Sequence, residues 1–430
     1  MTRFRMRHRQ LPGMIVIFAM IPALATADPA RTPRSWLDTA IRVVCPLPDL
    51  TGFDAQLNLS GSWLLDERRE PGGSDARRIT VDLALPGAEL MLERRQVSGV
   101  LRQFRASYFK TGPAGRQPVM LAIADGGCTV QSARMLRSEG TAWRYLDQLG
   151  GDMETLLWTE TLQSPWPAGQ DPGGIRVALV DSGLAYDLPA FRHRLARDRD
   201  GQPLGYDFWD LDPWPYDGDT SRGPFLPIRH GTAVASVLAC EAPDAALVPF
   251  RYPRPDMDRM ADVVASAAAA GARILAMPLG SRDRRDWTRF EQALAAHDIL
   301  AIVSAGNDGR DIDTAPVFPA ALTLANILTV TSSDGFGRLA QGSNWGATSV
   351  DIMLPAENIE ITEFRGATGV ASGSSYAVPR LAALAARLLA REPGLSTAEL
   401  KSRILDRAAP SPFERAGVVS GGWIPDPLAD

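Results

Sequence analysis

Short, nearly continuous apolar runs recur through the C-terminal part of the chain. They lie at residues 175–180, 246–250, 274–277, 300–303 and 327–330. Runs of this kind, without alternation, are typical of strands that are buried on both faces of a sheet. Stretches with apolar residues at helical spacing separate several of them, at 230–239, 258–270 and 287–296. Strands that alternate with helices predict right-handed βαβ crossovers, and therefore an α/β fold built on a parallel sheet.

Two further helices are predicted to close this α/β region. The first spans residues 375–390 and carries leucines on one face, with Pro379 expected within its first turn. The second opens with Ser396 and Glu399 at the spacing of a capping box. In an open parallel sheet, reactive groups lie at the carboxyl ends of strands or at the helix starts just beyond them. Candidate chemistry is therefore expected at those positions.

The pattern before residue 165 is different, because apolar and polar positions alternate there. Alternating runs lie at 79–85, 90–92 and 119–123, and pairs of Pro and Gly separate them as turns would. This pattern predicts a smaller, β-rich antiparallel domain over residues 28–164. Helices are expected at 35–44 and around 143–149.

Three further boundaries follow from the composition of the chain. Residues 165–174 are rich in Pro and Gly and lack periodicity, which predicts a linker. The α/β domain is then expected at 175–410, followed by a C-terminal tail at 411–430.

The first 27 residues have the three parts of a secretory signal peptide. Four arginines precede an apolar run at 11–24, and Ala25-Thr26-Ala27 supplies the small residues of a cleavage site. The run is short for a membrane span and contains prolines. We expect cleavage after Ala27 and a protein that acts in the periplasm or is secreted. A buried N-terminal helix is the alternative, which the arginines disfavour.

Composition excludes several classes of function. The 430 residues are 45% hydrophobic, which is enough apolar surface for folded domains and argues against disorder. The formal net charge is −5, and loss of the four signal arginines lowers it to −9. A chain of this charge is not expected to bind nucleic acid through a basic surface. After signal removal, no later segment predicts a membrane span.

Cysteine usage suggests one disulfide and no metal site. Cys45 and Cys128 both lie in the N-terminal third and form the expected pair, since export permits disulfides. Cys240 is then expected as a buried thiol. No spacing of cysteine and histidine suits a structural zinc ion, so no metal ligands are expected.

Three short segments place chemically active side chains at the expected positions. Asp181 follows a predicted buried strand and precedes Ser-Gly, His230 begins a helix in the sequence Arg-His-Gly-Thr, and Ser375 begins a long apolar helix in Gly-Ser-Ser-Tyr-Ala-Val-Pro. A serine hydroxyl becomes a nucleophile when an imidazole takes its proton, and a carboxylate orients that imidazole. A fourth segment ends a strand with Ala-Gly-Asn, so that Asn307 supplies a neutral donor suited to an oxyanion.

Together these segments resemble the subtilisin-like serine peptidase family (subtilases) over residues 173–408. The family motifs are D-S/T-G, H-G-T-x-V-A, A-G-N and G-T-S-x-A-x-P. The first three occur here in this order, and the fourth follows with Ser in place of Thr. The resemblance implies that Asp181 orients the base, His230 is the general base and acid, and Ser375 is the nucleophile. It also implies that Asn307 is the oxyanion donor and that no cofactor is required. The expected substrates are proteins or peptides, and the oligomeric state stays open.

The resemblance also identifies residues that would bind substrate, and three departures from the family pattern. The family's S-L-G substrate strand appears as Pro278, Leu279 and Gly280, in which the proline has no N–H to donate. Ser304 and Gly306 are also expected to bind substrate, with Gly280 and Gly306 leaving an open pocket for an apolar side chain. Beside the nucleophile, Ser374 replaces the usual Thr and Tyr376 a frequent Met.

An acidic stretch at 207–219 lies between the Asp and His segments. Carboxylates at this density are compatible with a structural calcium ion, but their spacing matches no specific calcium motif. A solvated acidic loop, which attracts basic substrates, is the favoured interpretation.

The leading hypothesis is a secreted serine endopeptidase that acts through an acyl-enzyme. The alternative is a catalytically weak, subtilisin-shaped binding or adaptor protein, whose mark would be a lost catalytic residue. An esterase is disfavoured because the chain lacks its G-x-S-x-G segment and its Ser, Asp, His order. Residues 28–164 are interpreted either as a propeptide that is removed or as a permanent accessory domain.

Overall fold

The computed structural model describes residues 31–48, 63–69, 76–85, 87–113, 115–139, 142–413 and 417–429. The segment expected to be a signal peptide lies outside these described residues. The chain divides into two compact units. One contains Met1–Leu162 with the short segment Gly223–Leu226, and the other contains Gln163–Arg222 with Pro227–Asp430.

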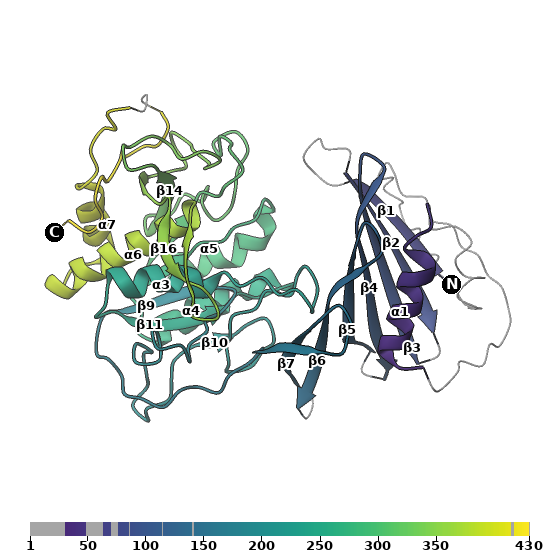
Figure 1. Ribbon diagram of the computed structural model, residues 1–430. Helices are drawn as coiled ribbons and strands as arrows, with labels where there is room; N and C mark the ends of the chain where they lie inside the picture. The colour runs from purple at the N-terminus through teal and green to yellow at the C-terminus, as the bar shows by residue number, and fades with distance from the viewer. Residues whose placement is uncertain are drawn as a thin grey trace, which may run out of the picture. The chain divides into compact units, whose positions relative to one another are not determined.

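The N-terminal unit is an antiparallel sheet of eight strands in consecutive order, each joined to the next (Figure 1). The strands are β1 Trp63–Arg69, β2 Ala76–Leu85, β3 Ala88–Val97, β4 Val100–Gly112, β5 Gly115–Asp125, β6 Val130–Glu139, β7 Ala142–Leu149 and β8 Leu156–Thr161. This meander matches the predicted β-rich domain. It forms because alternating residues give each strand two distinct faces.

Helix α1 (Pro33–Val44) covers one face of this sheet. Thr32 caps its N-terminus by accepting from the backbone N–H of Ser35, and Leu37 and Ile41 are buried against strand residues such as Phe104. Burial of one helical stripe against a sheet provides the hydrophobic stabilisation of the unit.

The predicted disulfide is confirmed, because Cys45 at the end of α1 is bonded to Cys128 in the turn between β5 and β6. The prediction of a buried third thiol is wrong, since Cys240 is free and exposed. Cys240 lies in the last turn of helix α3, where the otherwise buried helix turns one position toward solvent.

The helix predicted around residues 143–149 is also wrong, because this segment is strand β7. It pairs with β6 on one side and β8 on the other. Leu146 and Leu149 pack into different hydrophobic clusters, as expected for opposite faces of one strand. Asp147 between them is buried and paired with Arg137. Because side chains on both faces of β7 are buried, the segment lacks the alternation of apolar and polar residues that would have indicated a strand.

The C-terminal unit is built on a parallel sheet of seven strands in the order β10-β11-β9-β12-β13-β14-β15. The strands are β9 Arg176–Asp181, β10 Tyr206–Asp207, β11 Ala246–Arg251, β12 Ile274–Met277, β13 Leu300–Ser304, β14 Ile327–Ser333 and β15 Ile352–Pro355. The predicted α/β class is confirmed: all pairings in this sheet are parallel.

Helices cover both faces of this sheet and make three layers. Successive strand residues point to opposite faces, so Val177 and Leu179 pack with the helices of one face and Ala178 and Val180 with those of the other. The first face carries α3 Gly231–Glu241, α6 Ser374–Arg391 and α7 Thr397–Leu405. The second carries α4 Met260–Ala269 and α5 Thr288–Ala295, with short 3₁₀ turns η1 Met257–Arg259 and η2 Arg284–Trp287.

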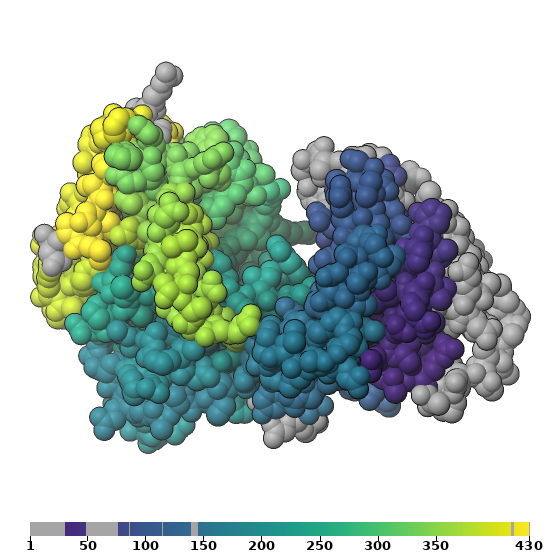
Figure 2. All heavy atoms as spheres, in the orientation of Figure 1, coloured from purple at the N-terminus to yellow at the C-terminus, as the bar shows by residue number. Residues whose placement is uncertain are grey.

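A surface hairpin precedes helix α6, and a proline lies inside the helix. The hairpin of β16 Ile359–Thr362 and β17 Thr368–Ala371 lies on the surface of this unit, coloured yellow-green in Figures 1 and 2. Pro379 was expected in the first turn of α6, but the helix begins at Ser374 and places it in the second turn. Because proline has no N–H, the carbonyl of Ser375 lacks its usual helical partner.

Candidate active site

Asp181 and His230 are joined at the carboxyl edge of the parallel sheet. Asp181 is the last residue of β9, and His230 directly precedes helix α3. Nδ1 of His230 lies 2.8 Å from both Oδ1 and Oδ2 of Asp181, whose side chain is buried. A carboxylate at this distance accepts the Nδ1 proton. Nε2 of the imidazole is therefore left to take up a proton from another group.

A buried network holds the start of α3 against the end of β9. The hydroxyl of Ser182 accepts from the backbone N–H groups of His230 at 3.1 Å and Gly231 at 2.9 Å, and it donates to Asp217 Oδ1 at 2.6 Å. Asp217 is fully buried, and its other oxygen accepts from the N–H and the hydroxyl of Thr232. These contacts fix the His230 backbone relative to Asp181. The sequence pattern gave no sign of this role for Asp217, because it resembles the other acids of its stretch.

The neighbouring carboxylates set the protonation of His230. Burial lowers the pKa of His230, but the adjacent Asp181 carboxylate raises it by charge and by hydrogen bonding, and Asp217 and Asp219 add to the increase. The resulting pKa of His230 is about 9. A base with this pKa is predominantly protonated at neutral pH.

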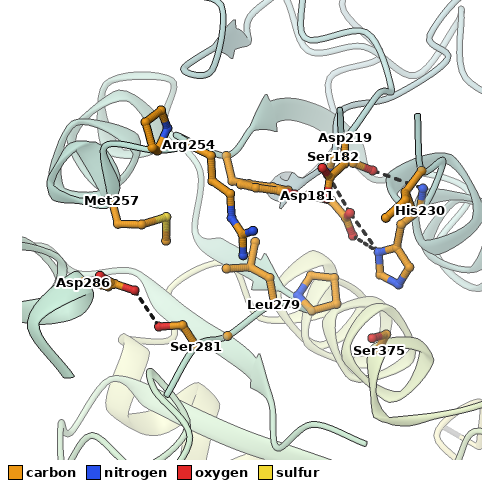
Figure 3. Close-up of a pocket in the computed structure, with 15 residues that line it drawn as sticks. Asp181, Ser182, Asp219, His230, Arg254, Met257, Leu279, Ser281, Asp286 and Ser375 are labelled. Atoms are coloured by element: carbon orange, nitrogen blue, oxygen red, sulfur yellow. Dashed lines mark hydrogen bonds and ion pairs between the residues drawn. The ribbon is translucent and has the colours of Figure 1, made fainter. Parts of the chain in front are cut away.

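Ser375 lines the same cavity as Asp181 and His230, which has a volume of about 450 Å³. Figure 3 shows the His230 ring between the Asp181 carboxylate and Ser375. Ser375 lies in the first turn of α6, after Gly373 with a φ of 125°. Among the described residues, no hydrogen bond joins the Ser375 hydroxyl to the imidazole. Such bonds in ligand-free sites are often long and tighten when substrate binds.

Asn307 follows strand β13 and is anchored by the start of α6. Its Oδ1 accepts from the backbone N–H of Ser374 at 2.9 Å and from the Ser374 hydroxyl at 3.0 Å. Since both contacts use the oxygen, the amide Nδ2–H₂ group of this exposed side chain is left as a donor.

The expected substrate residues fall into two groups. Pro278, Leu279 and Gly280 line the cavity (Figure 3 labels Leu279), whereas Ser304 and Gly306 are not part of its lining. Ser304 is 4% exposed.

The expectation that two glycines leave open space is not supported. A Cβ at Gly280 would lie 2.8 Å from the carbonyl oxygen of Phe318, and one at Gly306 would lie 2.7 Å from Nδ2 of Asn344. Glycine is therefore needed at both positions for the close approach of neighbouring segments.

The cavity is also lined by Asp219 from the acidic stretch and by polar and charged residues that the sequence pattern did not single out. The hydroxyl of Tyr252 donates to Asp219, and Ser281 donates to Asp286 at 2.8 Å. Figure 3 shows the side chain of Arg254 extended toward Leu279. These side chains come from segments far apart in sequence, so no local motif marks them.

The ring of Tyr376 lies beside the imidazole of His230. Its ring centroid lies 6.1 Å from that of His230. Burial, together with the charge of Asp181, raises the pKa of its phenol. Tyr376 therefore stays neutral and acts as a packing group beside the imidazole.

Carboxylates of the acidic stretch at 207–219 accept hydrogen bonds from other groups of the protein. Asp207 accepts from Arg251 and from two backbone N–H groups, and burial raises its pKa to about 6 despite the arginine. Asp212 accepts from Gln163 and from the Trp214 N–H. In the part of the chain that the structure describes, no group of three or more His, Cys, Asp or Glu residues is arranged to hold a metal ion.

Among the described residues, no helix has the length and apolar character needed to cross a lipid bilayer.

The model of the subtilase family matches residues 173–421. The thermophilic serine proteinase of Bacillus sp. (strain AK1) is 28% identical over 257 residues, which cover 56% of this chain and 57% of that protein. The minor extracellular protease Vpr of Bacillus subtilis (strain 168) is 31% identical over 216 residues, covering 46% of this chain and 26% of that protein. The chain thus matches from about a quarter to just over half the length of these curated relatives.

A solved structure of a cold-adapted subtilisin-like serine proteinase also aligns with the chain. It is 22% identical, covers 63% of this chain and 95% of its own, and has a TM-score of 0.49.

Proposed function

The chain belongs to the subtilase family of serine peptidases, and we propose that it is an endopeptidase that cleaves peptide bonds through an acyl-enzyme intermediate. The observation that carries this proposal is the pairing of His230 Nδ1 with the buried Asp181 at 2.8 Å, in a cavity that Ser375 also lines. A nucleophile, a base and a group that orients the base are the parts that serine catalysis requires.

In the proposed reaction, the Ser375 hydroxyl attacks the carbonyl carbon of the scissile peptide bond. Its proton passes to Nε2 of His230, while Asp181 stabilises the imidazolium that forms. The imidazolium then protonates the leaving amine, the C–N bond breaks, and the acyl group stays on Ser375 as an ester. Water, deprotonated by the same imidazole, hydrolyses that ester and restores the free serine.

Negative charge on the carbonyl oxygen would be stabilised by Asn307 and by the start of α6. The amide Nδ2–H₂ group of Asn307 is free to donate because the amide oxygen is held by Ser374. The N-terminus of a helix adds backbone N–H groups and a favourable dipole. A donor of this kind typically contributes about 100- to 1000-fold in turnover.

Substrate backbone would lie along Pro278, Leu279 and Gly280, which line the cavity. An extended peptide pairs with such a segment through main-chain hydrogen bonds. Pro278 accepts through its carbonyl but donates nothing, so substrate register would depend on the other two residues.

We further propose that the protein acts outside the cytoplasm, in the periplasm or as a secreted enzyme, after removal of residues 1–27. The signal-like sequence and the disulfide between Cys45 and Cys128 support this proposal, since disulfides form in oxidising compartments. The acting enzyme needs no cofactor in this proposal.

The role of residues 28–164 is tested by N-terminal sequencing of the purified protein beside Ser375→Ala. A new N-terminus near residues 173–175 that the variant lacks identifies a propeptide removed by the enzyme itself. An intact chain in both proteins identifies a permanent accessory domain.

The proposed activity is tested by incubating the exported protein with a denatured protein substrate. We expect internal cleavage by the natural enzyme and none by Ser375→Ala. Ser402→Ala is the matched control, because Ser402 is an exposed serine on α7. Equal cleavage by the natural protein and Ser375→Ala would refute the proposal.

A further inference from the structure

Ser304 and Ser374 form a buried pair of hydroxyl groups behind Asn307. Ser304 is the last residue of β13 and Ser374 the first of α6. Their Oγ atoms are 2.7 Å apart, and the two residues are 4% and 0% exposed. The pair therefore joins the strand that leads to Asn307 with the helix that carries Ser375.

The hydrogen bonds of this network can run in only one direction, because each hydroxyl has a single proton to donate. The backbone N–H of Ser374 can only donate, so the atom of Asn307 that it contacts at 2.9 Å is the amide oxygen. The Ser374 hydroxyl lies 3.0 Å from the same oxygen and must donate its one proton there. With that proton used, the Ser374 oxygen accepts from the hydroxyl of Ser304.

The chain of hydrogen bonds ends at the backbone. Ser304 Oγ accepts from the N–H of Gly306 at 3.1 Å. The complete sequence of donors runs from the Gly306 N–H through Ser304 and Ser374 to Oδ1 of Asn307. If Ser304 were the acceptor from Ser374 instead, two oxygens 3.0 Å apart would face each other without a proton between them.

We propose that Ser304 is a positioning residue for the oxyanion donor. It makes no contact with substrate in this role, because its hydroxyl is buried and directed at Ser374. It fixes the rotation of the Asn307 amide so that Nδ2 points away from the network. Hydrogen bonds in a chain polarise one another, so the same network strengthens Nδ2 as a donor. This proposal rests on the proposed function, since an oxyanion forms only during acyl transfer.

The role differs from that of a wall of the substrate pocket. A wall residue contacts the bound side chain, so its loss changes KM and the preference among substrates. A residue that acts through Asn307 affects an interaction made in the transition state, so its loss lowers kcat and leaves KM nearly unchanged.

The test is a double-mutant cycle on a chromogenic peptide anilide. We expect Ser304→Ala to lower kcat by about 10-fold, less than the 100- to 1000-fold typical for loss of an oxyanion donor itself. In the Asn307→Ala background, the same substitution should change kcat by less than about 2-fold, because the group being positioned is absent. Ser332→Ala is the matched control, since Ser332 is buried on the next strand and bonded to Glu357 instead.

An unchanged kcat in Ser304→Ala, an effect on KM alone, or an equal loss of kcat in both backgrounds would overturn the proposal. If Ser304→Ala does not fold, Ser304→Cys serves in its place, since a thiol keeps the shape but donates weakly. It must then show the same dependence on Asn307. Failure of the proposed function is distinct, because the natural enzyme itself would then be inactive.

Discussion

Nδ1 of His230 lies 2.8 Å from both carboxylate oxygens of Asp181, although the two residues are 49 positions apart in the chain. The parallel sheet brings them together, because β9 ends at Asp181 and α3 begins just after His230. The contact fixes the tautomer in which Nε2 is free to accept a proton. It also ties the charge of the imidazole to the carboxylates around it.

The first prediction concerns the pH dependence of activity. Only neutral His230 accepts a proton from Ser375, and its pKa is about 9. We expect kcat/KM to rise with pH and reach half its maximum near pH 9, which initial rates between pH 5 and 11 will show. Because the folded-state pKa exceeds the usual 6.5, the pairing stabilises the fold below pH 6.5, and this contribution is lost as pH rises through about 9. A midpoint near 6.5 would contradict the effect of the Asp181, Asp217 and Asp219 carboxylates on the imidazole.

Substitution of Asp217 tests more sharply whether neighbouring carboxylates raise the pKa of His230. Its buried carboxylate raises the pKa of His230 and is hydrogen-bonded to Ser182 and Thr232. Asp217→Asn removes the negative charge, so the midpoint of the kcat/KM profile should move to lower pH. Asp262→Asn, an exposed carboxylate on α4, is the control and should leave the midpoint in place. A shift to higher pH would be inconsistent with a charge effect on the imidazole.

Gly373 tests how closely the start of α6 is fitted to Asn307. A Cβ at this position would lie 3.0 Å from Oδ1 of Asn307, and its φ of 125° disfavours other residues. We expect Gly373→Ala to lower kcat on the order of 100-fold, because Asn307 must shift. Gly366→Ala is the matched control: its φ is also positive, at 83°, but its neighbour is Leu188. If both variants lose activity equally, backbone strain rather than the contact with Asn307 is responsible.

The disulfide is predicted to stabilise the N-terminal unit. Cys45 and Cys128 are 83 positions apart, so the bond restricts a long loop of the unfolded chain. Replacing both with serine should lower the free energy of unfolding of this unit by about 2–4 kcal/mol, measured by urea denaturation. Cys240→Ser should have little effect, because this thiol is exposed and unbonded. Equal stability of the double variant and the natural protein would exclude this contribution.

The sequence predicted five of the seven strands of the parallel sheet, because strands buried on both faces leave short apolar runs. It missed β10, which is two residues long, and β15. It also indicated Asp181, His230 and Ser375, since each sits at a strand end or helix start where parallel sheets place reactive groups. The structure brings all three to one cavity.

What the sequence did not reveal depends on contacts between distant segments. Asp217 is hydrogen-bonded to Ser182, 35 positions away, and Ser304 to Ser374, 70 positions away. No local sequence pattern marks either pair, because the residues are serines and aspartates of the kind found throughout the chain. The strand β7 was missed for a related reason: its two buried faces meet partners that only the folded sheet provides.

The assignment of Ser375 as the nucleophile is tested by identifying the residue that a fluorophosphonate probe modifies. The natural protein is labelled at the pH of its maximal activity, digested, and the modified peptide is sequenced by tandem mass spectrometry. We predict a single adduct on the Oγ of Ser375, and strongly reduced labelling in His230→Ala because the base is missing. An adduct on a different residue, or equal labelling of Ser375→Ala and the natural protein, would contradict the assignment of Ser375 as the nucleophile.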